Sequence, residues 1–356
     1  MKYPIGIQDF EDLQRNGYAY VDKTNFVYKL ADEGKYYFLS RPRRFGKSLF
    51  LSTLEAYFQG KKELFEGLAI YDLETEWKKY PIFHIDLNTA NFREKDSLYT
   101  VLNDYLTNWE DKYGARESEA TLALRFKGVI ARAAEKEGCG VVILIDEYDK
   151  PILQTLRDPE LQAEHRAQLK AFYSVLKTQD RYIKFAFLTG VTKFGKVSVF
   201  SDLNNLTDIS MDHRYISICG MTEKELLANF KEGINELAEA NGDTEEATIA
   251  KLKARYDGYH FEENTVGIYN PFSVLNTLAK SRYDDYWFKA NTHTFLFDIL
   301  KKHDYCITEF SKAQIKANMM NNVDSNPFLD IYLSGYLTIK SYDERFKNYQ
   351  LGIPNK

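Results

Sequence analysis

Short apolar segments alternate with helical patterns over the first 220 residues of the chain. Several of these segments are short and apolar enough to be strands buried on both faces. They lie at residues 36–39, 81–85, 141–145, 183–188 and 215–218. Between them, apolar residues recur at helical spacing, over residues 97–109 and 122–133. Because strands that alternate with helices form parallel sheets, we predict an α/β fold with a doubly wound parallel sheet.

The strand pattern fades after about residue 220. Thr222 and Glu225 form a capping box ahead of an apolar stretch, and Asn270 is an N-cap residue followed by proline. These signals predict a mostly helical region. Two short strands are expected later, within residues 332–339 and 349–351, and a helix near residues 312–317 is one candidate to cover their apolar face.

The overall charge is mildly acidic, with 47 Lys and Arg against 52 Asp and Glu, a net charge of −5. This balance argues against a protein whose whole surface binds nucleic acid, although a local basic patch is compatible with it. The cysteines, Cys139, Cys219 and Cys306, form no Cys-x-x-Cys pair, which favours a reducing, cytoplasmic compartment. The longest purely apolar run, residues 141–145, is too short to cross a membrane. We therefore expect no membrane as a partner.

The first expected strand leads into a loop that ends in Gly46, Lys47 and Ser48 and is followed by a helical pattern. These residues match the last three fixed positions of the phosphate-binding pattern G-x-x-x-x-G-K-[ST], and Arg41 replaces its first glycine. A strand, a loop and a helix in this order direct backbone N–H groups and the positive helix end toward one place. There Lys47 would bind the β- and γ-phosphates, and the Ser48 hydroxyl would hold Mg²⁺.

Arginines accompany this loop at positions 41, 43 and 44. They could form a solvated basic loop. We interpret Arg41, Arg43 and Arg44 instead as groups that meet phosphate oxygens, because guanidinium groups bind phosphate in a bidentate fashion.

Two adjacent carboxylates follow the buried segment 141–145. Asp146 would lie at the carboxyl edge of the sheet, where open α/β sheets bind ligands, and it suits a Mg²⁺ role through water. Glu147 suits the base that orients the attacking water. The alternative is an acidic strand end that only caps the following loop, and for Asp149 a chemical and a structural role are both open.

Thr189 ends the strand predicted at residues 183–188. Its hydroxyl could reach a γ-phosphate or the attacking water, which makes it a sensor candidate, or it could satisfy its own turn. No arginine finger can be assigned, because Arg157, Arg181 and Arg214 are each compatible with a surface ion pair.

These motifs together resemble the bacterial AAA-ATPase-like family, which is related to the STAND and archaeal-type branches of the AAA+ P-loop ATPases. The resemblance covers nearly the whole chain. It is carried by the motifs at residues 20–24, 41–48, 145–149, 203–209, 219–222, 256–259 and 269–272.

The resemblance implies Lys47 and Ser48 as Walker A residues, Asp146 and Glu147 as Walker B residues, and Thr189 as a sensor. It also implies that Val21, Asp22 and Lys23 lie against the adenine. The cofactor-binding residues expected in the loop and at the start of its helix are Arg41, Arg43, Arg44, Phe45, Gly46, Lys47, Ser48 and Leu49. Arg41 in place of the glycine belongs to the family's own pattern. Members of this family typically carry a PD-(D/E)XK nuclease domain beyond the point where this chain ends, so a truncated chain is expected.

We therefore predict a P-loop AAA+-like ATPase domain at residues 1–220, a helical lid domain at 221–310 and a partial winged-helix-like module at 311–356. The expected function is Mg²⁺-dependent binding and slow hydrolysis of ATP as a conformational switch, with ATP and ADP as ligands. The alternative is a nucleotide-sensing scaffold without turnover. Nucleic acid is a possible partner that this chain does not indicate, an oligomer is possible, and a nuclease within this chain is disfavoured.

Overall fold

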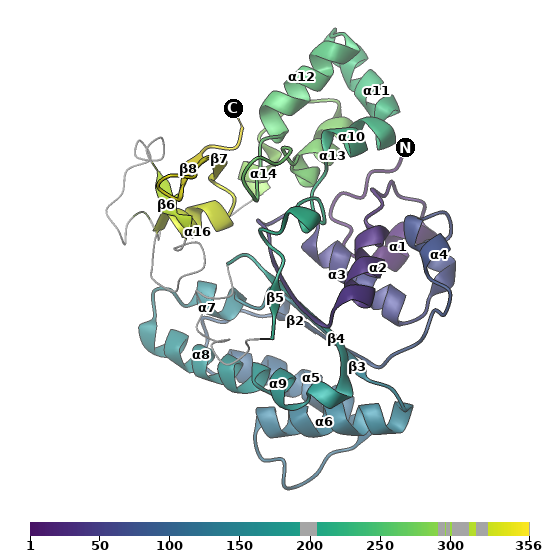
Figure 1. The fold of residues 1–356 in the computed structure, drawn as a ribbon, viewed down its shortest axis with the longest axis vertical. Coiled ribbons are helices and arrows are strands. Elements are labelled where there is room, and N and C mark those ends of the chain that lie inside the picture. The colour runs from purple at the N-terminus through teal and green to yellow at the C-terminus, as the bar shows by residue number, and fades with distance from the viewer. Residues whose placement is uncertain (193–204, 291–295, 297–299, 301–312, 318–326, 356) are drawn as a thin grey trace. The chain divides into compact units, whose positions relative to one another are not determined.

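The computed structural model describes residues 1–192, 205–290, 296, 300, 313–317 and 327–355 (Figure 1). Cys306 and the motif residues 203–204 lie outside the described residues. Contacts between residues divide the chain into two compact units. The sheet unit consists of Val27–Ser40 and Leu54–Ile209, and the helical unit consists of Met1–Phe26, Arg41–Thr53 and Ser210–Lys356. The boundaries predicted at residues 220 and 310, and the winged-helix-like module, stay predictions.

A parallel five-stranded sheet forms the centre of the sheet unit, which confirms the predicted fold class. The strand order is β2-β3-β4-β1-β5. The strands are β1 (Tyr36–Ser40), β2 (Ile82–Asp86), β3 (Val141–Asp146), β4 (Ile183–Gly190) and β5 (Thr207–Asp208). Every residue of β1 and β3 is buried, as the unbroken apolar segments predict for strands covered on both faces.

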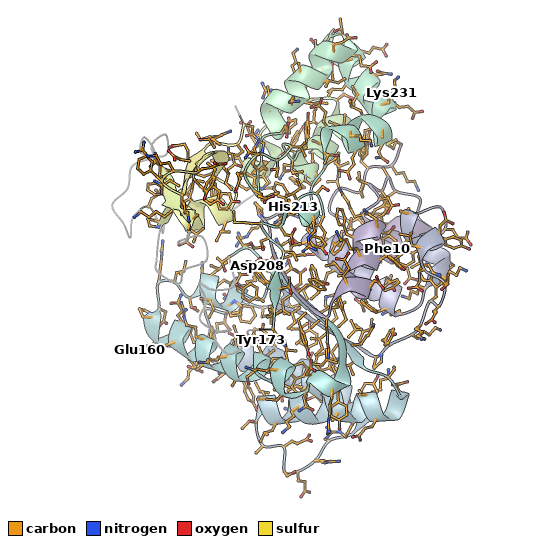
Figure 2. All side chains as sticks on the ribbon, viewed as in Figure 1. Phe10, Glu160, Tyr173, Asp208, His213 and Lys231 are labelled. Atoms are coloured by element: carbon orange, nitrogen blue, oxygen red, sulfur yellow. The ribbon has the colours of Figure 1, made fainter. Side chains whose placement is uncertain are left out.

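Helices pack on both faces of this sheet. On one face, a hydrophobic cluster contains buried residues of the sheet together with residues of α5 (Ser97–Tyr113), α6 (Leu122–Glu137) and α8 (Pro159–Tyr173). In this cluster Phe126 and Phe172 stack with their ring centroids 4.3 Å apart. On the other face Phe185 lies 4.9 Å from Phe58 in helix α3 (Lys47–Phe58). Figure 2 shows the side chains between these layers.

The ends of α8 differ in burial. Tyr173, at its last position, is fully buried, whereas Glu160, in its first turn, is exposed (Figure 2). The remaining α-helices described in the sheet unit are short. They are α4 (Ala69–Leu73), α7 (Lys150–Gln154) and α9 (Val175–Thr178), and α2 (Thr24–Glu33) begins in the helical unit and ends in the sheet unit.

The strand predicted at residues 215–218 is wrong. A 3-10 helix occupies His213–Tyr215, and the Asp212 side chain caps it by accepting from the Arg214 N–H. Tyr215 and Ile218 are both 1% exposed, with less buried residues between them. This spacing of three buries one side of a turn, whereas a strand buries alternate residues.

The region after residue 220 is mostly helical, as predicted, and its capping signals lie at the starts of α10 (Glu223–Asn229) and α13 (Pro271–Lys280). The helical unit also contains α1 (Phe10–Arg15), α11 (Lys231–Asn241), α12 (Glu245–Tyr256) and α14 (Tyr286–Ala290). The capping box is present at the start of α10, where the Glu225 N–H donates to Thr222 Oγ1 at 3.2 Å and the Thr222 N–H donates to Glu225 Oε2 at 2.8 Å. Asn270 caps α13, with its side chain accepting from the Ser273 N–H at 2.9 Å.

A three-stranded antiparallel sheet follows, in the order β6-β8-β7, from β6 (Gln314–Lys316), β7 (Thr338–Asp343) and β8 (Asn348–Gly352). The helix expected at residues 312–317 is wrong where the structure describes it, because Ile315 is buried between exposed Gln314 and Lys316 as in a strand. Residues 332–333 are also not a strand. They end helix α16 (Pro327–Leu333), whose last residues are all buried, so periodicity alone could not distinguish helix from strand.

Thr222→Ala is expected to destabilise the start of α10 by about 1 kcal/mol, because the Glu225 N–H loses its acceptor. Amide hydrogen exchange at Glu225 measures this, and an increase of about five-fold corresponds to that free energy. Thr222→Ser keeps the hydroxyl and serves as the control. Equal exchange in the alanine variant and the parent would show that the capping box adds nothing to the stability of α10.

Candidate functional site

The loop between β1 and α3 has the strand, loop and helix order that the sequence predicts. Two of its residues have left-handed backbone conformations, Arg44 with φ of +67° and Gly46 with φ of +95°. Glycine adopts this region without the steric cost of a Cβ atom, which suits Gly46 to the last turn before the helix. Because α3 starts at Lys47, its first N–H groups, which have no partner within the helix, lie beside the loop.

Lys47 places a buried cation in this loop. The residue is 5% exposed, and its Nζ donates to the backbone oxygens of Arg41 at 3.2 Å and Pro42 at 3.4 Å. Ser48 and Leu49 follow on α3 and are half-buried. An ammonium held beside a helix N-terminus is suited to bind a phosphate group.

Arg41 makes its contacts with protein groups. It is 1% exposed, and its guanidinium donates to the backbone oxygen of Ser210 at 2.7 Å and of Tyr215 at 3.2 Å. Its Cζ lies 4.0 Å from the centre of the Phe261 ring, a cation–π contact. These partners are all in the helical unit, so the guanidinium fastens the start of the loop to that unit.

The other two arginines are more accessible. Arg43 is half-buried, and its backbone oxygen accepts from Trp287 Nε1 at 3.0 Å. Arg44 is exposed, with its Cζ 5.1 Å from the centre of the Phe272 ring. Of the arginines in the loop, Arg43 and Arg44 are therefore the ones whose side chains can approach a ligand from solvent.

Phe45 holds the middle of the loop against the helical unit. It is 1% exposed and makes edge contacts with Tyr259 at 4.8 Å and Phe261 at 5.7 Å between ring centroids. Its backbone oxygen accepts from the Gly220 N–H at 2.9 Å. These contacts explain how one apolar side chain stabilises a loop that is otherwise rich in charge.

A pocket lies beside this loop within the helical unit. Its empty volume is about 580 Å³, part of it open to solvent. Five residues that were predicted to bind the cofactor line it, namely Val21, Lys23, Phe45, Gly46 and Leu49. The rest of the lining is mainly apolar and includes Ala19, Tyr20, Phe50, Ile218, Met221 and Leu275. An apolar slot of this kind suits a planar base.

Asp22 and Lys23 have different environments. The Asp22 carboxylate accepts from the Thr24 N–H at 2.8 Å and the Thr24 hydroxyl at 2.7 Å, so it supports the start of α2. Lys23 is 7% exposed and pairs with Glu225 at 2.5 Å. Burial lowers the pKa of the Lys23 ammonium, and the Glu225 carboxylate opposes this shift.

Asp146 and Glu147 lie where β3 ends. Asp146 is 4% exposed, and its Oδ1 accepts from the Glu147 N–H at 2.9 Å. Glu147 is half-buried and has a left-handed backbone with φ of +50°, an uncommon conformation for a residue with a side chain. Because all strands of the sheet are parallel, the carboxyl ends of β1, β3 and β4 lie at the same edge.

Thr189 and Asp149 are both fully buried. Among the residues that the structure describes, the Thr189 hydroxyl has no hydrogen-bond partner. The Asp149 carboxylate accepts from the Val191 N–H at 3.1 Å, and from the N–H and the hydroxyl of Thr192 at 2.6 Å each.

The predicted residues therefore divide between the two units. Asp146, Glu147 and Thr189 belong to the sheet unit, and Val21, Asp22, Lys23 and the loop residues belong to the helical unit. Sequence reasoning assigned no role to the pocket residues 218–221 or to Thr192. Residues 219–222 did belong to the run of motifs behind the family resemblance, which was the available signal for that side of the pocket. Thr192 carried no signal, since its partner Asp149 is 43 positions away.

A family model described as "Predicted AAA-ATPase" matches residues 4–200. The chain belongs to this AAA-ATPase-like family, which confirms the resemblance. Membership in the family points to nucleotide binding.

One curated relative is an "Uncharacterized protein in vnfD 5'region" from Azotobacter chroococcum mcd 1. It is 38% identical over 362 residues, which cover 99% of this chain and 67% of that protein. Among solved structures, the chain is similar to the Aeropyrum pernix ORC2 protein, solved as ADPNP-ADP complexes, with 12% identity and a TM-score of 0.32. That comparison covers 99% of this chain and 90% of the other.

The described residues contain neither a metal-binding cluster nor a membrane-spanning helix. No group of three or more His, Cys, Asp or Glu side chains that could hold a metal occurs in the part of the chain that the structure describes. Within that same part, no helix has the length and apolar character needed to cross a membrane.

Proposed function

We propose that this chain binds ATP together with Mg²⁺ and hydrolyses it slowly, as a conformational switch. The observation that carries the proposal is the buried Lys47 ammonium, held in the Arg41–Ser48 loop at the start of α3. In this proposal the ammonium exchanges its contacts with the Arg41 and Pro42 backbone oxygens for contacts with phosphate oxygens. Arg43 and Arg44 add positive charge on the solvent side.

The adenine is proposed to lie in the pocket lined by Val21, Phe45 and Leu49. Its apolar walls support this role, because a base leaves water there without losing many hydrogen bonds. Lys23 would contribute a donor to ring nitrogens at the edge of the pocket.

The Ser48 hydroxyl and the Asp146 carboxylate are the residues proposed to hold Mg²⁺. Oxygen donors fit this ion, which usually takes one or two protein ligands and completes its shell with water and phosphate oxygens. When bound, Mg²⁺ would neutralise charge on the β- and γ-phosphates.

Glu147 is proposed to accept the proton of the attacking water, and Thr189 to contact the γ-phosphate. Glu147 is half-buried, so part of the residue is open to solvent, which supports the first role. Thr189 is fully buried, and its hydroxyl has no hydrogen-bond partner among the described residues, so its contact with the γ-phosphate requires the end of β4 to open. If the end of β4 stays closed, the second candidate function applies, a nucleotide-sensing module without turnover. The cytoplasmic location, an oligomer, nucleic acid as a partner and a following nuclease domain stay predictions.

The test is a calorimetric titration with ATP followed by phosphate release with and without Mg²⁺, each also in the presence of DNA. We expect saturable binding and a slow release that requires Mg²⁺. Binding without release would support the sensing module. A folded chain that binds no nucleotide would contradict both candidate functions.

Ala19→Trp is expected to lower ATP affinity by about ten-fold, equivalent to roughly 1.4 kcal/mol, because the indole occupies space proposed for the base. Affinity for inorganic triphosphate should not change, because that probe uses only the loop. Ala240→Trp, at an exposed position on α11, is the matched control. Equal ATP affinity in the Ala19→Trp variant and the parent would exclude this pocket as the base site.

A further inference from the structure

We propose that Asp149 is a positioning residue for hydrolysis. Its carboxylate binds the residues that follow β4 and so fixes the turn that contains Glu147. This inference rests on the proposed function. It assigns Asp149 a role in orienting the predicted base Glu147, whereas the sequence alone leaves both a chemical and a structural role open for Asp149.

The first support is the environment of the Asp149 carboxylate. The side chain has 0% exposure, and its oxygens accept from the Val191 N–H, the Thr192 N–H and the Thr192 hydroxyl. A buried carboxylate is costly unless donors compensate for the lost water, and hydrogen bonds to a charged acceptor are the strong ones. Asp149 therefore joins the turn after β3 to the residues that follow β4.

Tyr148 makes a second connection between the same two segments. Its N–H donates to the Thr189 backbone oxygen at 3.1 Å, and its hydroxyl donates to the Thr192 backbone oxygen at 3.2 Å. The Tyr148 ring makes an edge contact with Phe38 of β1 at 5.4 Å. The turn after β3 is thus held by both its backbone and its side chains.

Gly190 shows how closely these segments approach. A Cβ atom at this position would lie 2.6 Å from Asp149 Oδ1 and 2.6 Å from two carbons of the Tyr148 ring. Real Cβ atoms do not come this close to other heavy atoms. The last residue of β4 must therefore be glycine for Asp149 and Tyr148 to occupy their positions.

The consequence falls on Glu147, which lies between buried Asp146 and buried Tyr148. Its φ of +50° is unfavourable for a residue with a side chain, and such conformations persist where the surroundings impose them. The Lys150 N–H donates to the Glu147 backbone oxygen at 3.0 Å and closes the turn. If the connections through Asp149 loosen, Glu147 can relax and its carboxylate loses its fixed direction.

The same geometry argues against Asp149 as the base itself. A general base must be within hydrogen-bond reach of the water that it activates. Both Asp149 oxygens already accept from protein donors, and the side chain has no exposed surface.

The test compares Asp149→Asn, Thr192→Val and the control Thr192→Ser in the full chain. Asparagine at position 149 would present either its NH₂ group or an uncharged, weaker acceptor to the donors of Val191 and Thr192. Valine at position 192 removes the hydroxyl donor, and serine at position 192 keeps it. We expect Asp149→Asn to lower kcat by about ten-fold or more and Thr192→Val by a few-fold, with ATP affinity within about three-fold of the parent, because only the transition-state interaction changes. Thr192→Ser should behave like the parent.

Two readouts separate positioning from a merely structural role. The acid limb of the pH profile of kcat should keep its inflection in Asp149→Asn, because Glu147 is still the base. Loss of that inflection would identify Asp149 as the base and overturn the proposal. Loss of ATP affinity in parallel with kcat, or a parental kcat in Asp149→Asn, would overturn it as well. A parent chain that releases no phosphate would instead overturn the proposed hydrolysis, and hydrogen exchange at Val191 and Thr192 would still report whether Asp149 holds these amides.

Discussion

Glu147→Gln is expected to keep ATP bound and to lower its turnover by about a hundred-fold or more, because a general base must present a basic oxygen to the attacking water. Glutamine has the shape of glutamate without its charge, so contacts that depend on shape persist. The left-handed backbone at position 147 is no less favourable for glutamine than for glutamate. Calorimetric titration measures binding, and phosphate release under saturating ATP measures turnover.

Glu160→Gln is the matched control for this experiment. It makes the same chemical change at an exposed position of α8 and should leave binding and turnover at the parental level. Parental turnover in Glu147→Gln would make Glu147 a structural residue. The base would then have to be sought outside the β3 turn, since the Asp149 carboxylate is buried and accepts from Val191 and Thr192.

The parallel sheet could be predicted because its strands are buried on both faces. A strand such as Val141–Asp146 is then almost wholly apolar over six residues, a pattern that is typical of buried strands in parallel sheets. The wrong predictions of helices and strands concern segments whose pattern of buried residues matches neither the helical nor the strand period clearly. At Pro327–Leu333 the end of the helix is buried on all sides, and at Gln314–Lys316 the strand is too short for its alternation to stand out.

The candidate site shows a similar limit. The spacing of Gly46, Lys47 and Ser48 indicates the loop, because the strand, loop and helix are consecutive in the chain. The environment of Arg41 depends on Ser210 and Tyr215, which are 169 and 174 positions away. Local pattern groups this arginine with Arg43 and Arg44, whereas only the fold distinguishes the buried guanidinium from the accessible ones.

Lys47→Ala is expected to weaken ATP binding by roughly ten- to hundred-fold, since hydrogen bonds to charged groups contribute about 1.5 to 3 kcal/mol each. Alanine brings no donor toward the phosphates, and water is a poor substitute for an ammonium at the start of a helix. The measurement is calorimetric titration with ATP. Lys224→Ala removes an exposed lysine on α10 and should leave the affinity unchanged.

The loss must be separated from damage to the loop, because the Lys47 ammonium also donates to the Arg41 and Pro42 backbone oxygens. Lys47→Met keeps the length and the apolar stem of the side chain, so a comparable loss in both variants assigns the effect to the charge. Hydrogen exchange at the Gly220 amide, which donates to Phe45, reports whether the loop keeps its place on the helical unit. Parental affinity in a variant whose Gly220 amide stays protected would show that Lys47 does not bind phosphate and would contradict the role proposed for this loop.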